Sequence, residues 1–182
     1  MNYLEQVFGL QDRRIVITGA GGLLGTVFSQ ALARAGAELV LIDKDKNALE
    51  LCGTKLNSID VSPELIVCDL TNYENVYTII NDIGQRGPID GLVNSAAIDP
   101  KADRKDLESS NAGWFTNYPL KYWYSSLDAN LTGVFIISQA VCGVMERQES
   151  RKGVIVNLCS TYGLVGPDQS IYKDEKDVQL FY

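Results

Sequence analysis

A glycine-rich stretch near the amino terminus combines residue types and spacing that suit phosphate binding. Thr18 is followed by glycines at positions 19, 21, 22 and 25, between the apolar run 14–18 and the helix-like pattern 24–35. Glycines at such a turn let the backbone approach a pyrophosphate, and the unpaired N–H groups of the helix start attract its charge. Gly25 would instead allow the helix to pack closely on the strand. Isolated glycine clusters are common, but this strand–turn–helix setting predicts a dinucleotide-binding turn.

Asp43 is placed to bind the adenosine half of a dinucleotide. It follows the apolar run 38–42, and a carboxylate at that strand end can reach the ribose hydroxyls. Its charge repels a 2′-phosphate, so the sequence favours NAD over NADP, although the neighbouring Lys44 weakens this preference. A solvated strand-end charge or a helix N-cap remains the alternative interpretation of Asp43.

The groups available for proton transfer and metal binding are restricted. The chain has no histidine, which excludes a Ser-His-Asp triad and leaves proton transfer to Tyr, Lys, Asp or Glu. Cys52, Cys68, Cys142 and Cys159 stand singly in apolar segments and form no C-x-x-C pair. We expect all four to be reduced core thiols rather than metal ligands or disulfides, and we predict no metal site.

Composition and charge narrow the classes of partner. The 182 residues are enough for one domain with a substantial core, and the net charge of −7 leaves no basic surplus for nucleic acid. Residues 1–10 contain Glu5 and lack the basic start of a signal peptide. No apolar run approaches the roughly 20 residues that a membrane span needs. We expect a soluble cytoplasmic protein whose partner is a small molecule.

The chain alternates between short apolar runs and longer amphipathic stretches. The runs are 14–18, 38–42, 65–67, 89–93 and 154–156, and the helical patterns are 24–35, 48–56, 75–83 and 127–145. Continuous apolar runs are typical of strands buried on both faces. The alternation predicts one α/β dinucleotide-binding domain over residues 1–182, with a doubly wound, Rossmann-type parallel sheet in the order 3-2-1-4-5. Segments 99–117 and 161–182 are predicted loops at the ligand-binding edge.

Five motifs in sequence order resemble those of the short-chain dehydrogenase/reductase family, and the resemblance runs from about residue 10 to residue 167. They are the glycine motif from Thr18 to Gly25, Asp69-Leu70, Asn94-Ser95-Ala96-Ala97, the segment from Asn130 to Phe135, and the segment from Ile155 to Ser160. Two departures concern glycine. Leu23 stands where the commonest branch of the family has its middle glycine, so that Gly22 gives the spacing of an epimerase-like branch. Ala97 replaces the glycine that usually ends the motif after the fourth strand.

The resemblance implies an NAD(H)-dependent oxidoreductase that interconverts a secondary alcohol and a ketone, and it suggests a homo-oligomer. Residues 160–169 resemble a bacterial branch linked to surface-sugar synthesis, which suggests a small, sugar-like substrate. By the same resemblance, Ser160 would orient the substrate oxygen and Asn130 would hold a water for proton relay. Otherwise, Ser160 satisfies a turn and Asn130 bonds nearby backbone. The cofactor-binding residues implied are Thr18, Gly19, Gly22, Leu23, Leu24, Asp43, Asp69, Leu70, Asn94 and Ala96.

The family's catalytic Tyr-x-x-x-Lys pair normally follows the Ser by about a dozen residues and precedes a further helix and two strands. Tyr172 and Lys176 have this spacing, but they lie in the densely charged segment 172–177. They are therefore either the pair itself or part of a solvated loop before it. We expect a chain that is incomplete at its carboxyl end and lacks the usual C-terminal strands and helices. The alternatives are a noncatalytic dinucleotide-binding fragment or sensor and, from the glycine spacing, a nucleotide-sugar epimerase or dehydratase.

Overall fold

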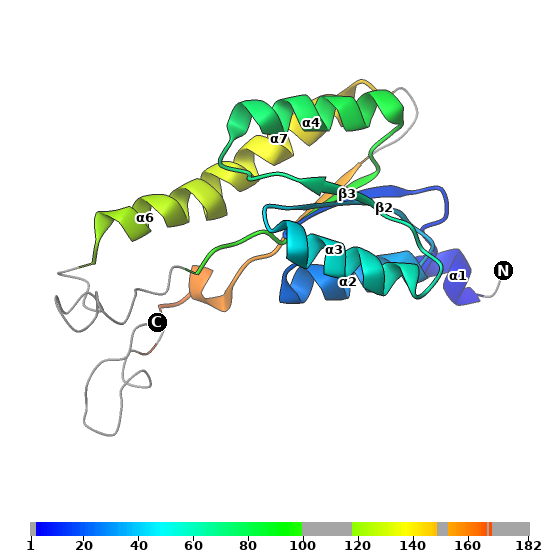
Figure 1. The fold of residues 1–182 in the computed structure, drawn as a ribbon, viewed down its shortest axis with the longest axis horizontal. Coiled ribbons are helices and arrows are strands. Elements are labelled where there is room, and N and C mark those ends of the chain that lie inside the picture. Colours follow the sequence, from blue (N-terminus) through cyan, green and yellow to red (C-terminus); the bar gives the residue numbers. More distant parts are fainter. Residues whose placement is uncertain (1–2, 100–117, 149–152, 167, 169–182) are drawn as a thin grey trace.

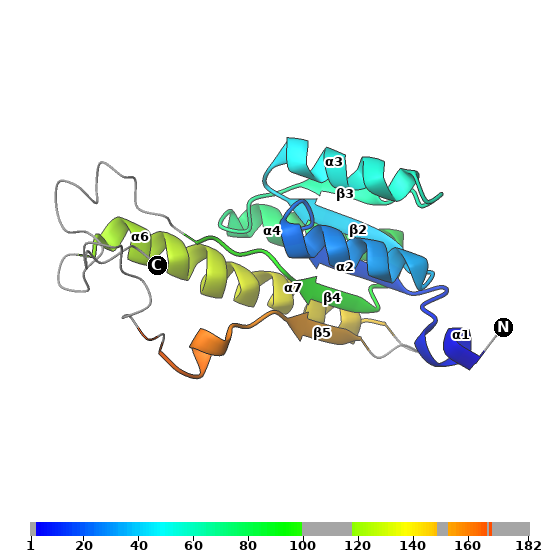
Figure 2. The same ribbon diagram turned by 90° about the horizontal axis from the view of Figure 1, so that it is seen from below.

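The computed structural model describes residues 3–99, 118–148, 153–166 and 168, and these residues build a parallel sheet with helices on both faces (Figures 1 and 2). The sheet has five strands in the order β3-β2-β1-β4-β5, and every neighbouring pair is parallel. This confirms the predicted doubly wound arrangement. The strands are β1 (Arg14–Thr18), β2 (Glu38–Asp43), β3 (Glu64–Val67), β4 (Gly91–Asn94) and β5 (Val154–Asn157).

Two helical layers cover the sheet, and each buries its own core. On one face α2 and α3 pack against Ile15, Ile17, Leu39 and Leu41. On the other face α4 and α7 pack against alternate residues of the same strands, including Val16 and Val40. The helices before the fourth strand are α1 (Tyr3–Phe8), α2 (Leu23–Arg34), α3 (Lys46–Asn57) and α4 (Tyr73–Arg86). Those after it are α6 (Leu120–Leu127), the π-helical η2 (Asp128–Gly133), α7 (Val134–Glu146) and the 3-10 turn η3 (Thr161–Gly163).

Burial on both faces holds only for the inner strands. Every residue of β1 is buried, as are most residues of β2 and β4. The edge strands differ: β3 alternates between partly buried and exposed, and in β5 Val154 and Val156 are 62% and 49% exposed. The prediction of full burial was therefore wrong for β3 and β5, because a continuous apolar run does not tell an edge strand from a central one.

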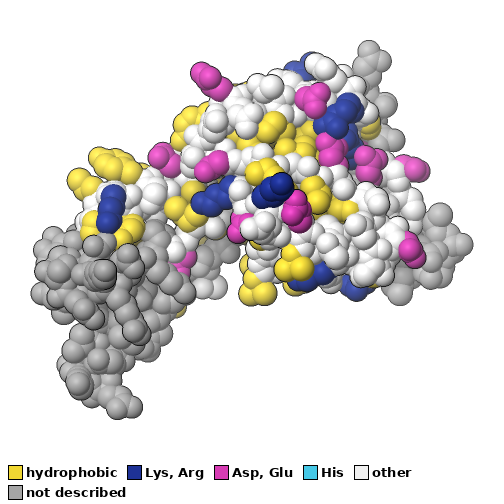
Figure 3. All heavy atoms as spheres, viewed as in Figure 1, with side chains coloured by type: hydrophobic (Ala, Val, Ile, Leu, Met, Phe, Trp, Pro, Cys, Tyr) yellow, Lys and Arg dark blue, Asp and Glu magenta, His cyan; other side chains and the backbone are white. Residues whose placement is uncertain are grey.

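The helix predicted over 127–145 begins earlier and is not uniformly α-helical. It runs from Leu120 to Glu146 as α6, η2 and α7. By length and composition this helix could cross a membrane, with mean hydropathy 1.4 in a window that is 28% buried. The expectation that no such stretch exists was therefore wrong. Its α7 part contributes Ile137, Val141 and Val144 to the core, while apolar side chains are exposed over α6 (Figure 3).

The cysteines divide between interior and surface. Cys52 and Cys68 are buried, whereas Cys142 and Cys159 are exposed, and all four are free thiols. The prediction of four core thiols was therefore wrong for two of them. Cys142 falls on the outward side of α7, next to the buried Val141, and Cys159 follows β5 after the strand has ended.

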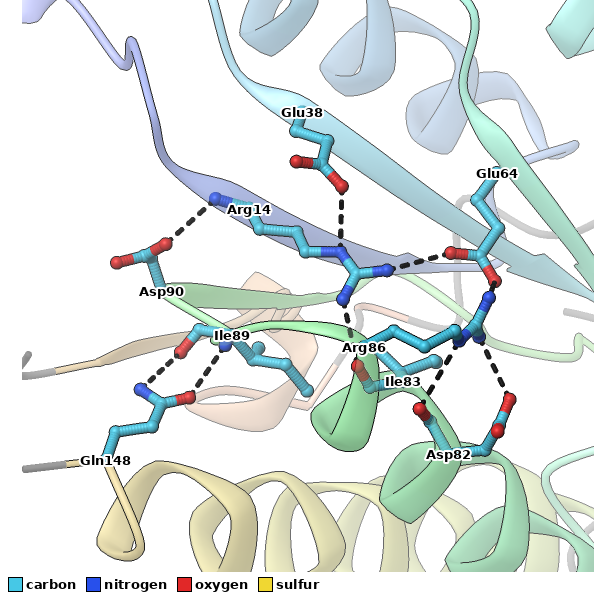
Figure 4. Close-up of polar contacts among 9 residues, drawn as sticks. All are labelled: Arg14, Glu38, Glu64, Asp82, Ile83, Arg86, Ile89, Asp90 and Gln148. Carbon is cyan, nitrogen blue, oxygen red and sulfur yellow. Dashed lines mark hydrogen bonds and ion pairs between the residues drawn. The ribbon is translucent and has the colours of Figure 1, made fainter.

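Arg14 joins the amino ends of three strands to a helix (Figure 4). Its side chain is buried, with Nη1 donating to the Ile83 carbonyl at 2.9 Å and Nη2 to Glu64 at 2.9 Å. Its Nε lies 3.0 Å from a carboxylate oxygen of Glu38. Glu64 also pairs with Arg86 of α4 at 2.7 Å. One guanidinium thus links β1, β2, β3 and α4.

The segment before β4 is held at the same end of the sheet. The Asp90 carboxylate accepts from the Arg14 backbone N–H at 2.9 Å, and the Asp90 N–H donates to the Arg14 carbonyl at 2.8 Å. Arg13 adds an ion pair to Asp90 at 3.0 Å. The Gln148 side-chain amide, just after α7, accepts from the N–H of Ile89 at 2.7 Å and donates to its carbonyl at 3.1 Å (Figure 4). Strand β4 therefore enters the sheet fixed to both β1 and the long helix.

Substitution of Arg14 by methionine is expected to lower the free energy of unfolding by about 2 kcal/mol, because the buried Ile83 carbonyl loses its donor and Glu64 loses a partner. The measurement is urea unfolding. Arg34→Met, which removes an exposed arginine from the last turn of α2, serves as the control and should change stability by less than about 0.5 kcal/mol. Equal losses in the two variants would contradict a special role for Arg14.

Candidate functional site

A cleft of about 510 Å³ lies where the first four strands end. Its walls are the turn after β1, the segments after β2, β3 and β4, and one side of the helix around residues 125–129. Such carboxyl edges are where open parallel sheets bind ligands. The lining residues are Gly19, Gly21, Gly22, Ile42, Asp43, Lys44, Asp45, Ala48, Cys68, Asp69, Leu70, Thr71, Ser95, Ala96, Ala97, Ile98, Ser125, Asp128 and Ala129.

The glycine turn connects β1 to α2 on one wall of the cleft. Gly22 is the N-cap of α2 in an extended conformation, and among the described residues no side chain caps the helix start. The turn is closed by a hydrogen bond from the Gly22 N–H to the Gly19 carbonyl at 3.0 Å. A helix start without a side-chain cap leaves backbone N–H groups and the positive end of the helix dipole for an anion.

Two glycines of this turn are required by its geometry. Gly19 has φ of 63°, and a Cβ there would lie 2.6 Å from the Ala96 Cα. At Gly25 a Cβ would lie 2.0 Å from the Gly19 carbonyl oxygen. At Gly25 the helix therefore packs closely on the turn that follows β1 rather than on the strand itself, and the turn also rests against the segment after β4.

Asp43 lines the cleft and binds backbone on two sides. Its Oδ2 accepts from the N–H of Gly21 at 2.9 Å, and its Oδ1 accepts from the N–H of Asp45 at 2.9 Å. The helix cap that was an alternative for Asp43 belongs to Asp45, which accepts from the N–H groups of Asn47 and Ala48 at the start of α3. Asp43 thus connects the glycine turn to the end of β2.

Asp69 carries a fixed negative charge on the β3 side of the cleft. Its Oδ1 accepts from the Thr71 N–H at 2.9 Å and from the Thr71 hydroxyl at 2.8 Å. The backbone hydrogen bond from Thr71, with the hydroxyl bond and the charge of Lys44, holds the pKa of the Asp69 carboxyl below its ordinary value of 3.8. Burial and the Asp69 charge raise the pKa of the Cys68 thiol. The cleft therefore presents a carboxylate beside a protonated thiol.

Thr18 and Asn94 lie behind the cleft and position its wall. The Thr18 hydroxyl oxygen accepts from the N–H groups of Ser95 and Ala96 at 3.2 Å each. The buried Asn94 amide donates to Ser138 at 3.0 Å and to Asn157 at 2.8 Å, while its oxygen has no partner among the described residues. Thr18 thus fixes the segment after β4, and Asn94 ties the end of β4 to α7 and β5, although neither side chain lines the cleft.

Asn130 and Ser160, the two predicted catalytic residues, each bind backbone groups, Asn130 those of the segment after β4 and Ser160 its own turn. Asn130 lies in η2, where its side-chain oxygen accepts from the Ile98 N–H at 2.8 Å and its amide donates to the Ile98 carbonyl at 2.9 Å. Ser160 accepts from the N–H of Tyr162 at 3.1 Å at the start of η3. Neither is a lining residue of the cleft. Tyr172 and Lys176 lie outside the described residues.

The structure brings six of the ten predicted cofactor residues to the cleft wall, namely Gly19, Gly22, Asp43, Asp69, Leu70 and Ala96. Leu23 and Leu24 are instead 85% and 54% exposed and do not line it. Sequence reasoning missed Thr71 and the helix residues Ser125 and Asp128. Thr71 follows Asp69 by two residues, which is a signal for a side chain-to-backbone turn. Ser125 belongs to a part of the helix that was not predicted, whereas Asp128 lies within the predicted helix 127–145 but in no motif that pointed to the cleft.

Comparison with known proteins identifies the family. The family model described as short chain dehydrogenase matches residues 13–173. The chain belongs to the short-chain dehydrogenase family. It is 28% identical over 166 residues to the 5-keto-D-gluconate 5-reductase of Escherichia coli K12, covering 91% of this chain and 60% of that protein. It is 29% identical over 171 residues to the D-xylose 1-dehydrogenase of Caulobacter vibrioides NA1000, covering 92% and 61%.

A solved structure extends the similarity to the fold. The crystal structure of NAD+-bound xylitol dehydrogenase superposes with a TM-score of 0.74 at 30% identity, over 87% of this chain and 56% of that one. The chain spans about 60% of the length of the two curated relatives. The similarity therefore covers the part of a short-chain dehydrogenase that contains the parallel sheet and the cleft described above.

Gly25→Ala is expected to lower the free energy of unfolding by about 2 kcal/mol, because the new methyl group must displace the Gly19 carbonyl and with it the turn. Thermal unfolding measures the effect. Gly166→Ala is the control, since a Cβ there has nothing within 4 Å. Wild-type stability in Gly25→Ala would show that the helix is not held against the turn.

The Asp69 carboxylate should contribute stability that depends on pH. Because its pKa is lowered on folding, this contribution is fully present above the unfolded value of 3.8 and is lost as the pH falls through the lower folded pKa. We expect the difference in unfolding free energy between wild type and Asp69→Asn to shrink as the pH is lowered past 3.8, measured by urea unfolding. A difference that does not change with pH would contradict the assignment.

Proposed function

We propose that the cleft binds NAD(H) and that the protein to which this chain belongs is an oxidoreductase that interconverts a secondary alcohol and a ketone. The observation that carries the proposal is the start of α2 behind a glycine turn, which no described side chain caps, with Asp43 at the end of β2 in the same cleft. The similarity to an NAD+-bound structure supports the same ligand.

The cleft residues fit a dinucleotide in three parts. The glycine turn and the start of α2 would receive the pyrophosphate. Asp43 has one lone pair engaged on each oxygen, so each oxygen can accept another hydrogen bond, from a ribose hydroxyl. Asp69 and Leu70 line the side that would hold the adenine ring. A carboxylate at Asp43 favours NAD over NADP, since a 2′-phosphate there would meet a negative charge.

The substrate we propose is a small polyhydroxylated molecule. The relatives are named for action on 5-ketogluconate and xylose, and the similar structure is a xylitol dehydrogenase. Bound NAD would accept or give the hydride. Ser160 would donate a hydrogen bond to the substrate oxygen from its position after β5, and Asn130 would hold the segment at Ile98 beside the reacting carbon. The matching proton would need a Tyr-x-x-x-Lys pair; Tyr172 and Lys176 have this spacing, and a solvated loop remains the alternative interpretation of their segment.

The first test is calorimetric titration of the chain with NAD and with NADP. We expect NAD to bind, and to bind at least about fivefold more tightly than NADP, because one unfavourable charge contact is worth about 1 kcal/mol or more near a protein surface. Absence of binding by either dinucleotide would refute the cofactor proposal. Preference for NADP would refute the role of Asp43 in selectivity.

The second half of the test follows nicotinamide absorbance with 5-ketogluconate, xylose and xylitol as substrates, and compares wild type with Ser160→Ala. We expect turnover to fall by at least about 100-fold in the variant while the affinity for NAD stays unchanged. Tight NAD binding without hydride transfer to any of these substrates would favour a noncatalytic dinucleotide-binding protein instead.

A further inference from the structure

The Asp43 carboxylate makes a contact with the glycine turn that ribose recognition does not require. Its Oδ2 accepts from the backbone N–H of Gly21 at 2.9 Å, across the space between the turn and the end of β2. Its Oδ1 is held by the N–H of Asp45 at 2.9 Å, so the carboxylate cannot rotate without losing a second bond. The partly buried side chain is therefore oriented toward the turn before any ligand arrives.

This contact determines how the middle of the turn lies. The Gly21 N–H donates to Asp43, which fixes the orientation of the peptide group between residues 20 and 21. Gly21 also lies against α3, where a Cβ would come within 2.8 Å of Ala48. One further bond, from the Ala20 N–H to the Ile42 carbonyl at 3.2 Å, ties the turn to β2. Asp43 is the side chain that completes this attachment.

We propose that Asp43 is a positioning residue for the phosphate-binding turn, in addition to any contact it makes with ribose. This inference rests on the proposed function, because it concerns the same nucleotide site. A turn held in its binding geometry avoids the cost of ordering that a free glycine segment would incur when a diphosphate binds. The carboxylate therefore increases the affinity for a diphosphate with which it makes no direct contact.

The sign of the effect separates this role from simple electrostatics. A diphosphate is an anion, so removal of a nearby negative charge should by itself strengthen its binding. Loss of a positioning contact should weaken it. A ribose-only role predicts a third result, in which the loss appears only for ligands that carry the ribose hydroxyls.

The experiment compares ADP with 2′,3′-dideoxy-ADP, which keeps the diphosphate but lacks both ribose hydroxyls. Each is titrated calorimetrically into wild type, Asp43→Ala and the control Glu50→Ala, which removes an exposed carboxylate of α3 that lies outside the cleft. We expect Asp43→Ala to lower the affinity for dideoxy-ADP by about tenfold or more, the usual effect of losing a hydrogen bond to a charged group. Glu50→Ala should bind both nucleotides as wild type does.

Three results would overturn the proposal, and they are distinguishable. If wild type binds neither nucleotide, the proposed dinucleotide site itself fails. If wild type binds both and Asp43→Ala binds dideoxy-ADP equally well, Asp43 acts on ribose alone. If dideoxy-ADP binds more tightly to Asp43→Ala than to wild type, the repulsion between the Asp43 charge and the diphosphate outweighs any positioning of the turn.

A second variant covers the case in which Asp43→Ala does not fold. Asp43→Asn keeps the shape of the side chain but has only one acceptor oxygen for the two N–H groups. In the chain without ligand, we expect the Gly21 amide to exchange its hydrogen slowly in wild type and faster in Asp43→Asn. Equal exchange rates would show that the carboxylate does not hold the turn, whatever the nucleotide affinities are.

Discussion

The carboxyl edge of the sheet can assemble a site only because the strands are held in register at their amino ends, where Arg14 is buried among its partners. In that register Thr18 pairs with Ile42 on one side and Asn94 on the other. A slip of one residue would move the glycine turn by about 3.3 Å and reverse the faces of β1. The Thr18 hydroxyl would then lose the backbone groups after β4. The polar network at one edge therefore fixes the geometry of the opposite edge.

Local patterns were sufficient to predict most of the fold but not its irregular helix. The inner strands and α2, α3 and α4 follow from apolar periodicity, which reports burial directly. The helix from Leu120 could not be predicted this way, because the aromatic-rich α6 contributes no buried residue to the core and so shows no core-facing period. The π-helical turn depends on tertiary contacts, such as Tyr73 with Asp128 and Asn130 with Ile98. No short stretch of sequence contains both partners of these contacts.

The candidate site was predictable to the extent that its chemistry is local. A glycine turn between strand and helix, and a carboxylate at the next strand end, need only neighbouring residues, and Gly19, Gly22 and Asp43 do line the cleft. Thr18 and Asn94 were assigned to the cofactor but support the wall from behind, and a motif cannot tell these two positions apart. That Asp43 reaches Gly21, which is 22 residues away, also becomes visible only in three dimensions.

Asn130 and Gln148 make the same pair of hydrogen bonds at opposite ends of β4. Each side-chain amide exchanges two hydrogen bonds with the backbone of one residue, Asn130 with Ile98 and Gln148 with Ile89. Each side-chain amide thus offers one donor and one acceptor to the backbone, as a residue of a neighbouring strand would. The long helix is consequently prevented from sliding along β4, since any axial displacement breaks a donor and an acceptor at both ends together. Sliding of the helix along β4 would therefore change the width of the cleft only at the expense of four hydrogen bonds.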